Sequence, residues 1–174
     1  MATHDVLHGI GVSAGTAAAP AAIVQPAPGV DTSEPGSVDA AADGARVREA
    51  LATISSRLSE RAAKAPEETK AILKATAQLA GDRGLAKAVD KKLKKGLGIT
   101  QAVHDAVEDY AQMLRSLGGY MAERATDLYD VRDRAICELR GLPEPGVPAF
   151  DGTVILVARD LAPAETATLN PETV

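Results

Sequence analysis

The chain has 174 residues, a formal net charge of −5 and one cysteine, Cys137, so an intramolecular disulfide is excluded. Hydrophobic residues make up 45% and aromatic residues 2%, which leaves Ala, Val, Leu and Ile to build the core. An acidic chain with so few stacking side chains is unlike a nucleic-acid-binding protein and better suited to a basic protein face. No segment reaches the roughly 18 apolar residues of a membrane span, and no basic leader precedes Val6. We therefore expect a cytoplasmic protein without membrane insertion.

The first third of the chain changes from an extended to a helical pattern. Glycine is dense between residues 6 and 24, which favours short strands or tight turns, and a linker rich in proline and glycine follows up to Gly36. From there the apolar positions recur at steps of four, three and four. They are Val47, Leu51, Ile54 and Leu58. This spacing predicts one long helix that ends near Lys64.

A broken helix comes next. Pro66 suits a first-turn position, and Glu67 and Glu68 follow where a helix dipole favours anions. Gly81 interrupts the helical pattern, and Asp82 is placed to cap a short continuation. The sequence therefore predicts two helical pieces in place of one continuous helix.

Two further helices are predicted before residue 141. Thr100 is a candidate N-cap for the first, and a Gly-Gly turn at 118–119 separates it from the second, which stops at Gly141. The expected inner face of the first is Val103, Ala106, Tyr110, Met113 and Leu117, and that of the second is Met121, Ala125, Leu128, Ala135 and Leu139. Short loops predict antiparallel neighbours.

After Pro148 the pattern is extended again, with a predicted buried strand at 154–157 and a helix that starts at Pro163. The fold class is therefore mainly α with a partial α/β part. We expect a bundle of two antiparallel helical hairpins (31–144) inserted into an incomplete α/β domain, whose two parts are residues 1–30 and 145–174. A lone strand–helix unit at the end predicts that the chain stops inside this domain and that its chemistry lies beyond Val174.

The residues that carry chemistry in other proteins are sparse here. His4, His8 and His104 lack a second ligand at metal-binding spacing, and Cys137 has no histidine nearby, so we expect no metal site and an inert thiol. The glycines at 9–15 do not match a phosphate-binding fingerprint. A lysine-rich run at 91–95 fits either a solvated helix end or a site for an anionic partner.

One feature allows two interpretations. Ile72, Leu73, Leu79 and Leu85 surround the break at Gly81. They can form ordinary core or an apolar groove rimmed by acidic residues, as protein-binding surfaces often have an apolar centre and a polar rim. Periodicity alone leaves both open.

Three segments together are similar to Enzyme I of the bacterial sugar phosphotransferase system. They are LHGIGVSAGTA (7–17), ERATDLYDVRD (123–133) and VILVARDLAPAET (154–166). The resemblance implies a phosphoenolpyruvate–protein phosphotransferase with a phosphohistidine α/β domain and an inserted helical domain that docks the carrier HPr. A C-terminal barrel, through which the family dimerises, would bind phosphoenolpyruvate and magnesium.

The family's phosphorylated histidine lies in a Gly-Gly-x-Thr-Ser-His motif that these 174 residues do not contain. By resemblance this chain holds no catalytic residue and no cofactor, and alone it would be inactive. The HPr-binding residues implied by the resemblance are Glu67, Glu68, Ala71, Leu79, Asp82, Leu85 and Arg124. Arg83, Gly84 and Tyr129 depart from the family pattern and affect the expected charge pairing.

Two alternatives remain beside a fragment of Enzyme I. One is a fragment of a related phosphoenolpyruvate-using synthase or dikinase, against which the inserted hairpins weigh. The other is a non-catalytic helical adaptor, which would have no use for partial α/β segments.

Overall fold

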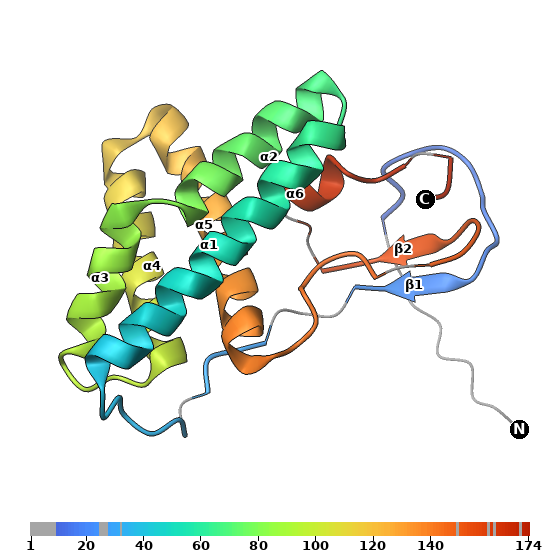
Figure 1. Cartoon of the computed structure of the whole chain (residues 1–174). Coiled ribbons are helices and arrows are strands. Elements are labelled where there is room, and N and C mark those ends of the chain that lie inside the picture. Colours follow the sequence, from blue (N-terminus) through green and yellow to red (C-terminus); the bar gives the residue numbers. More distant parts are fainter. Residues whose placement is uncertain are drawn as a thin grey trace, which may run out of the picture.

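The protein is described by a computed structural model in which a helical body stands beside a small two-stranded sheet (Figure 1). The structure describes residues 10–24, 28–31, 33–148, 150–159, 161, 163–170 and 172–174. In chain order the elements are β1 (Ala21–Ile23), α1 (Ala40–Lys64), α2 (Glu67–Ala80), α3 (Arg83–Leu93), α4 (Ile99–Leu117), α5 (Gly119–Arg140), β2 (Ile155–Val157) and α6 (Pro163–Thr166). The mainly α fold class predicted from the sequence is confirmed.

The helix boundaries follow from local chemistry. Asp39 begins α1, because its carboxylate accepts hydrogen bonds from the backbone N–H groups of Ala41 and Ala42, both at 3.0 Å. The helix ends at Lys64, as predicted, because the residue before Pro66 takes an extended backbone. The chain then starts α2 directly after the proline.

The predicted helix break is present. The α2 helix ends at Ala80, and Asp82 caps α3 by accepting hydrogen bonds from the N–H groups of Gly84 and Leu85 at 2.6 and 2.9 Å. These two bonds satisfy donors that the start of a helix leaves without intrahelical partners. The break therefore separates two well-formed helices.

The prediction that Thr100 caps the next helix is wrong. The α4 helix begins at Ile99, and Thr100 lies inside its first turn. The capping oxygen comes from Glu34, in the linker before α1. Its carboxylate accepts hydrogen bonds from the Thr100 N–H at 2.8 Å and from the Thr100 hydroxyl at 2.7 Å. A carboxylate at this position also complements the positive end of the helix.

The core lies between the five long helices. It is built from small aliphatic side chains, as the composition predicts, and α1 supplies Val47, Leu51, Ile54 and Leu58 in the predicted register. Helix α2 packs on α1 and α5, while α3 packs on α1 and α4. The two pieces of the broken helix thus contact different neighbours.

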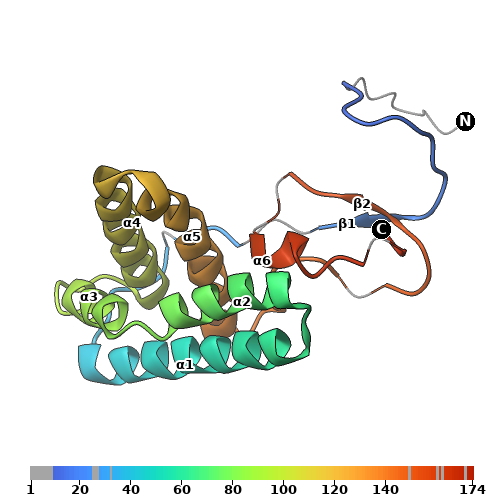
Figure 2. The same ribbon diagram turned by 90° about the horizontal axis from the view of Figure 1, so that it is seen from above.

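The two short strands pair in parallel, although the whole helical body separates them in the sequence. Ala21 pairs with Ile155 and Ile23 with Val157, and α6 lies between this sheet and the helical body (Figure 2). Strands that flank the helical block were predicted, and here they meet. The domain boundaries near residues 30 and 145 stay predictions.

The expectation of a buried strand at 154–157 is met only at Val154, which is 7% exposed. The side chains of Ile155 and Val157 are 39% and 47% exposed. The described sheet has two strands of three residues each, so it offers few neighbours to cover these side chains.

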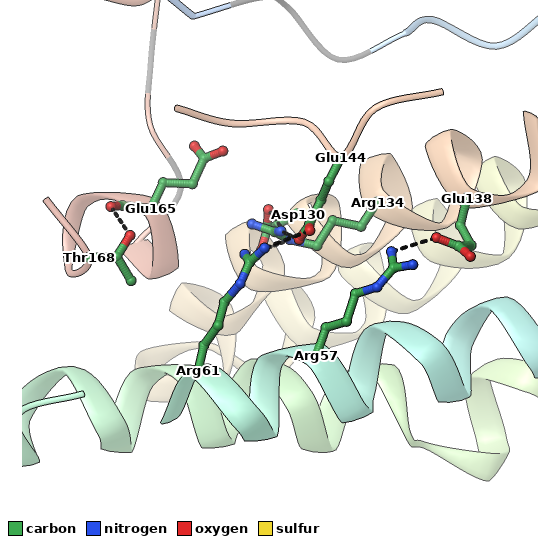
Figure 3. Close-up of polar contacts among 8 residues, drawn as sticks. All are labelled: Arg57, Arg61, Asp130, Arg134, Glu138, Glu144, Glu165 and Thr168. Carbon is green, nitrogen blue, oxygen red and sulfur yellow. Dashed lines mark hydrogen bonds and ion pairs between the residues drawn. The ribbon is translucent and has the colours of Figure 1, made fainter. Parts of the chain in front are cut away.

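A buried ion-pair network connects the end of α5 to the segment that follows it (Figure 3). The guanidinium of Arg134, 3% exposed, donates from Nε to both carboxylate oxygens of Asp130 at 3.0 and 2.9 Å and from Nη1 to Glu144. Glu144 also accepts a hydrogen bond from Arg61 of α1 at 2.6 Å. The network fixes the start of the chain that returns to β2.

Among the described residues no helix is both long and apolar enough to cross a bilayer.

Candidate docking surface

The outward face of α2 displays several of the residues expected to bind a partner. Glu67, Glu68 and Ala71 are exposed, and Asp82 lies exposed just past the end of the helix. Leu79 is half-buried and packs against the core. The structure therefore places four of these five residues on α2 and Asp82 just past its end, so that acidic residues lie at both ends of this helix.

Leu85 is not on this surface. Its side chain is 1% exposed and belongs to the core cluster with Val89 and Leu93 of α3. The expectation that Leu85 forms the apolar centre of a groove is therefore wrong. The four-residue spacing of Leu85, Val89 and Leu93 places all three on the inner face of α3.

An exposed apolar cluster lies instead at the turn between α4 and α5. We call it the tip cluster. Its members and their exposed fractions are Met113 (48%), Leu117 (66%), Tyr120 (61%) and Met121 (47%). The expectation that Met113, Leu117 and Met121 lie on inner helix faces is wrong, because this turn stands at the far end of α4 and α5 from α3 (Figures 1 and 2). Grouped exposed apolar side chains mark interaction sites more often than scattered ones.

The sequence does contain a signal for this cluster. Large apolar residues continue on both sides of the Gly118-Gly119 turn, up to the very ends of the two helices. Helix ends beside a turn are usually polar, since fewer neighbours are available to bury them. The helical period of α4 and α5 alone does not show that no other helix covers their apolar residues at this turn.

Tyr110 links the α2–α3 break to the tip cluster. A Cβ atom at Gly84 would come within 2.2 Å of the Tyr110 hydroxyl, so the first turn of α3 lies directly against α4 here. Burial, and then the nearby charge of Asp82, raise the pKa of Tyr110. Met113 and Leu117 follow Tyr110 one and two turns along α4.

Arg124 is held at the edge of the tip cluster. Its Nη1 donates to Asp127 at 2.9 Å, and its guanidinium lies 4.6 Å from the centroid of the Tyr120 ring. The contact with Tyr120 is a cation–π interaction that also orients the arginine. Arg124, expected to bind a partner, thus adjoins a partly exposed apolar patch.

Tyr129, which departs from the family pattern, lies between two arginines. The guanidinium groups of Arg115 and Arg132 are 5.3 and 4.9 Å from its ring centroid, and its hydroxyl donates to Glu108 at 3.1 Å. The ring therefore takes part in an ordered surface network.

The acidic side of this surface is weaker than the sequence suggests. Glu67 forms an ion pair with Lys70 at 3.0 Å, and Lys74 is exposed one turn further along α2. Glu68 and Asp82 remain exposed, although the Asp82 carboxylate also caps α3. The surface thus has a mixed charge.

No group of three or more histidine, cysteine or acidic side chains in the described part of the chain could hold a metal ion. His104 Nδ1 lies 3.2 Å from Asp105, while His4 and His8 fall outside the described residues. Cys137 is 2% exposed.

Comparison with known proteins decides the family. The family described as "PEP-utilising enzyme, N-terminal" matches residues 8–124. The chain belongs to this family. A phosphoenolpyruvate-protein phosphotransferase of Streptomyces coelicolor is 41% identical over 133 residues, which are 76% of this chain and 24% of that protein. One of Haloferax volcanii is 32% identical over 108 residues, which are 62% of this chain and 19% of that protein.

Solved structures give the same answer for this PEP-utilising enzyme domain. An NMR structure of Enzyme I has a TM-score of 0.72 at 28% identity, with 89% of this chain and 65% of that chain covered. An N-terminal domain of Enzyme 1 – Nitrogen has a TM-score of 0.62 at 26% identity, with 90% of this chain and 66% of that chain covered. The resemblance to Enzyme I is confirmed, and the chain spans about a quarter or less of the length of the curated relatives named above.

Proposed function

We propose that this chain docks the phosphocarrier HPr as the N-terminal part of a phosphoenolpyruvate–protein phosphotransferase in the cytoplasm. The observation that carries this proposal is the tip cluster together with Arg124, because it gives a family member an apolar centre with an adjacent cation. Glu67 and Glu68, exposed at the start of α2, would supply acidic contacts for the same carrier.

The proposal assigns docking to this chain and phosphoryl chemistry to other parts of the protein. By family resemblance the accepting histidine belongs to a motif that the 174 residues do not contain. A barrel domain would bind phosphoenolpyruvate and magnesium and form the dimer. The helical body would then act as the platform that holds HPr near the histidine, since phosphoryl transfer depends on positioning as well as charge stabilisation.

The experiment is calorimetric titration of cognate HPr into the wild-type chain and into Leu117→Ala. Truncation of an exposed side chain at the centre of an interface should raise Kd about tenfold, which corresponds to about 1.4 kcal/mol. The matched control is Leu142→Ala, because Leu142 is 41% exposed and lies past the end of α5, away from the α4–α5 turn. Equal losses in both variants, or no loss in Leu117→Ala, would contradict the proposed surface.

A further inference from the structure

The outward face of α3 carries four exposed cations. Arg83, Lys87, Lys91 and Lys94 recur every three or four residues and so form one stripe, which we call the α3 basic stripe. The opposite face of α3, with Leu85, is buried in the core. Residues 83–95 together have a net charge of +5 in a chain of net charge −5, so all other residues together have −10.

The stripe is not neutralised within the described part of the chain. The one acidic residue of α3, Asp90, pairs with Arg48 of α1 at 2.9 Å. Lys92, which lies off the stripe, pairs with Asp109 of α4 at 2.7 Å. None of the ion pairs among the described residues involves a member of the stripe.

Helix stability does not account for the whole stripe. Lys91 and Lys94 lie at the C-terminal end of α3, where the helix dipole favours cations. Arg83 is the first residue of the helix, where the dipole disfavours a positive charge. The helix dipole therefore does not account for the position of Arg83.

Two classes of anionic surface fit the stripe poorly. A membrane-bound amphipathic helix inserts its apolar face, but the apolar face of α3 is held in the core by α1 and α4. A nucleic acid normally meets stacking side chains and an overall positive field, and this chain has 2% aromatic residues and a negative net charge. An acidic patch on a protein meets neither objection.

We infer that the α3 basic stripe recognises an acidic patch on the HPr that docks here, an inference that rests on the proposed function. The stripe begins at Arg83, which directly follows Asp82, so it starts at the edge of the candidate docking surface, and Gly84 packs the first turn of α3 against Tyr110. Glu67 and Glu68 lie at the opposite end of α2 from the break, and the 14 residues of this helix span about 20 Å. The carrier must therefore present an acidic and a basic patch at opposite ends, and this polarity fixes its orientation.

The test compares association rates of cognate HPr, measured by stopped flow, for the wild-type chain and for Arg83→Glu/Lys87→Glu. The double variant should associate about tenfold more slowly at low salt, while its dissociation rate changes little. The difference should vanish near 1 M salt, where the Debye length falls to about 3 Å. The matched control, Arg140→Glu/Arg159→Glu, changes the net charge equally at exposed positions away from α3 and should associate as the wild type does at every salt concentration.

Each other outcome overturns the inference in a recognisable way. Unchanged or faster association of Arg83→Glu/Lys87→Glu, while Leu117→Ala still weakens binding, shows that HPr docks but has no acidic patch at α3. Absence of wild-type binding overturns the proposed function and this inference together. Tighter binding to phosphatidylglycerol vesicles than to HPr, lost in the double variant, assigns the stripe to a membrane surface.

Discussion

Arg134 shows how one residue joins distant parts of the chain. It is 3% exposed and contacts Asp130 in its own helix and Glu144 in the segment that returns to β2. Burial raises the pKa of Asp130, which its ion pair with Arg134 only partly offsets. Burial alone would lower the pKa of Arg134, but Asp130 and Glu144 raise it instead. A buried charge of this kind is costly to leave without its partners.

Replacing Arg134 by methionine should therefore destabilise the fold by about 3–5 kcal/mol at pH 7, because buried Asp130 loses its cation. The loss should be smaller at lower pH, since Asp130, whose pKa is already raised, then becomes protonated and no longer needs a positive neighbour. Urea unfolding at the two pH values measures both effects. The matched control is Arg57→Met, because Arg57 is 46% exposed in its pair with Glu138 and such pairs contribute only about 0–1 kcal/mol.

Cys137 should be protected from alkylation in the native state. Its side chain is 2% exposed, and burial raises the pKa of its thiol, which leaves less of the reactive thiolate at a given pH. Iodoacetamide should react slowly with the folded chain at pH 8 and rapidly in denaturant, and the folded rate should rise only at higher pH. Equal rates in both states would show that α5 exposes the thiol.

At the scale of single elements, the apolar residue expected at the docking surface, on α3, is buried, and the apolar residues expected in the core, at the α4–α5 turn, are exposed. The sequence predicts the break at Gly81 and the Asp82 cap, because capping chemistry is local. It does not show that Leu85 faces the core while Leu117 faces solvent, because both follow a helical period. Which apolar face is covered depends on where neighbouring helices end, and that is a property of the tertiary structure.

A matched pair of leucine variants separates these roles. Leu85→Ala should lower the free energy of unfolding by about 2–5 kcal/mol through the lost burial and the cavity it leaves. Leu117→Ala should change stability by no more than about 0.5 kcal/mol, because its side chain is 66% exposed. Denaturant unfolding of both variants measures the contrast, and a similar loss in both would show that the tip is part of the core.

Long-range capping is a second feature that sequence reading misses. Glu34 caps α4 from the linker before α1, 66 residues from Thr100. A threonine before an apolar period is a standard N-cap pattern, so the local reading chooses Thr100. Only the fold brings the linker next to the start of α4, where it supplies the carboxylate in place of the threonine hydroxyl.

At the scale of the whole molecule, the candidate docking surface and the small sheet lie on different parts of the protein. The surface is formed by α2, α4 and α5, whereas β1 and β2 meet beyond α6 (Figure 2). The change of period near residues 37 and 148 is enough to predict this arrangement in outline. The parallel register of β1 and β2 is not, because three-residue strands contain too little pattern to specify their pairing.

The two parts should differ in local stability, and hydrogen exchange measures the difference. The helical body buries a continuous core, while the described sheet has two three-residue strands with Ile23, Ile155 and Val157 partly exposed. A two-stranded sheet is marginally stable in water, and regions with few buried apolar contacts open first. Amides in residues 100–140 should therefore exchange slowly and at a rate set by global unfolding, and amides in 154–170 should exchange faster.

The hydrogen bond from the Thr69 hydroxyl to the Ala167 carbonyl, at 2.9 Å, ties the end of α6 to α2 and should leave α6 better protected than β2. Protection of β2 equal to that of α4 in a monomer would show that the sheet and the helical body unfold as one unit.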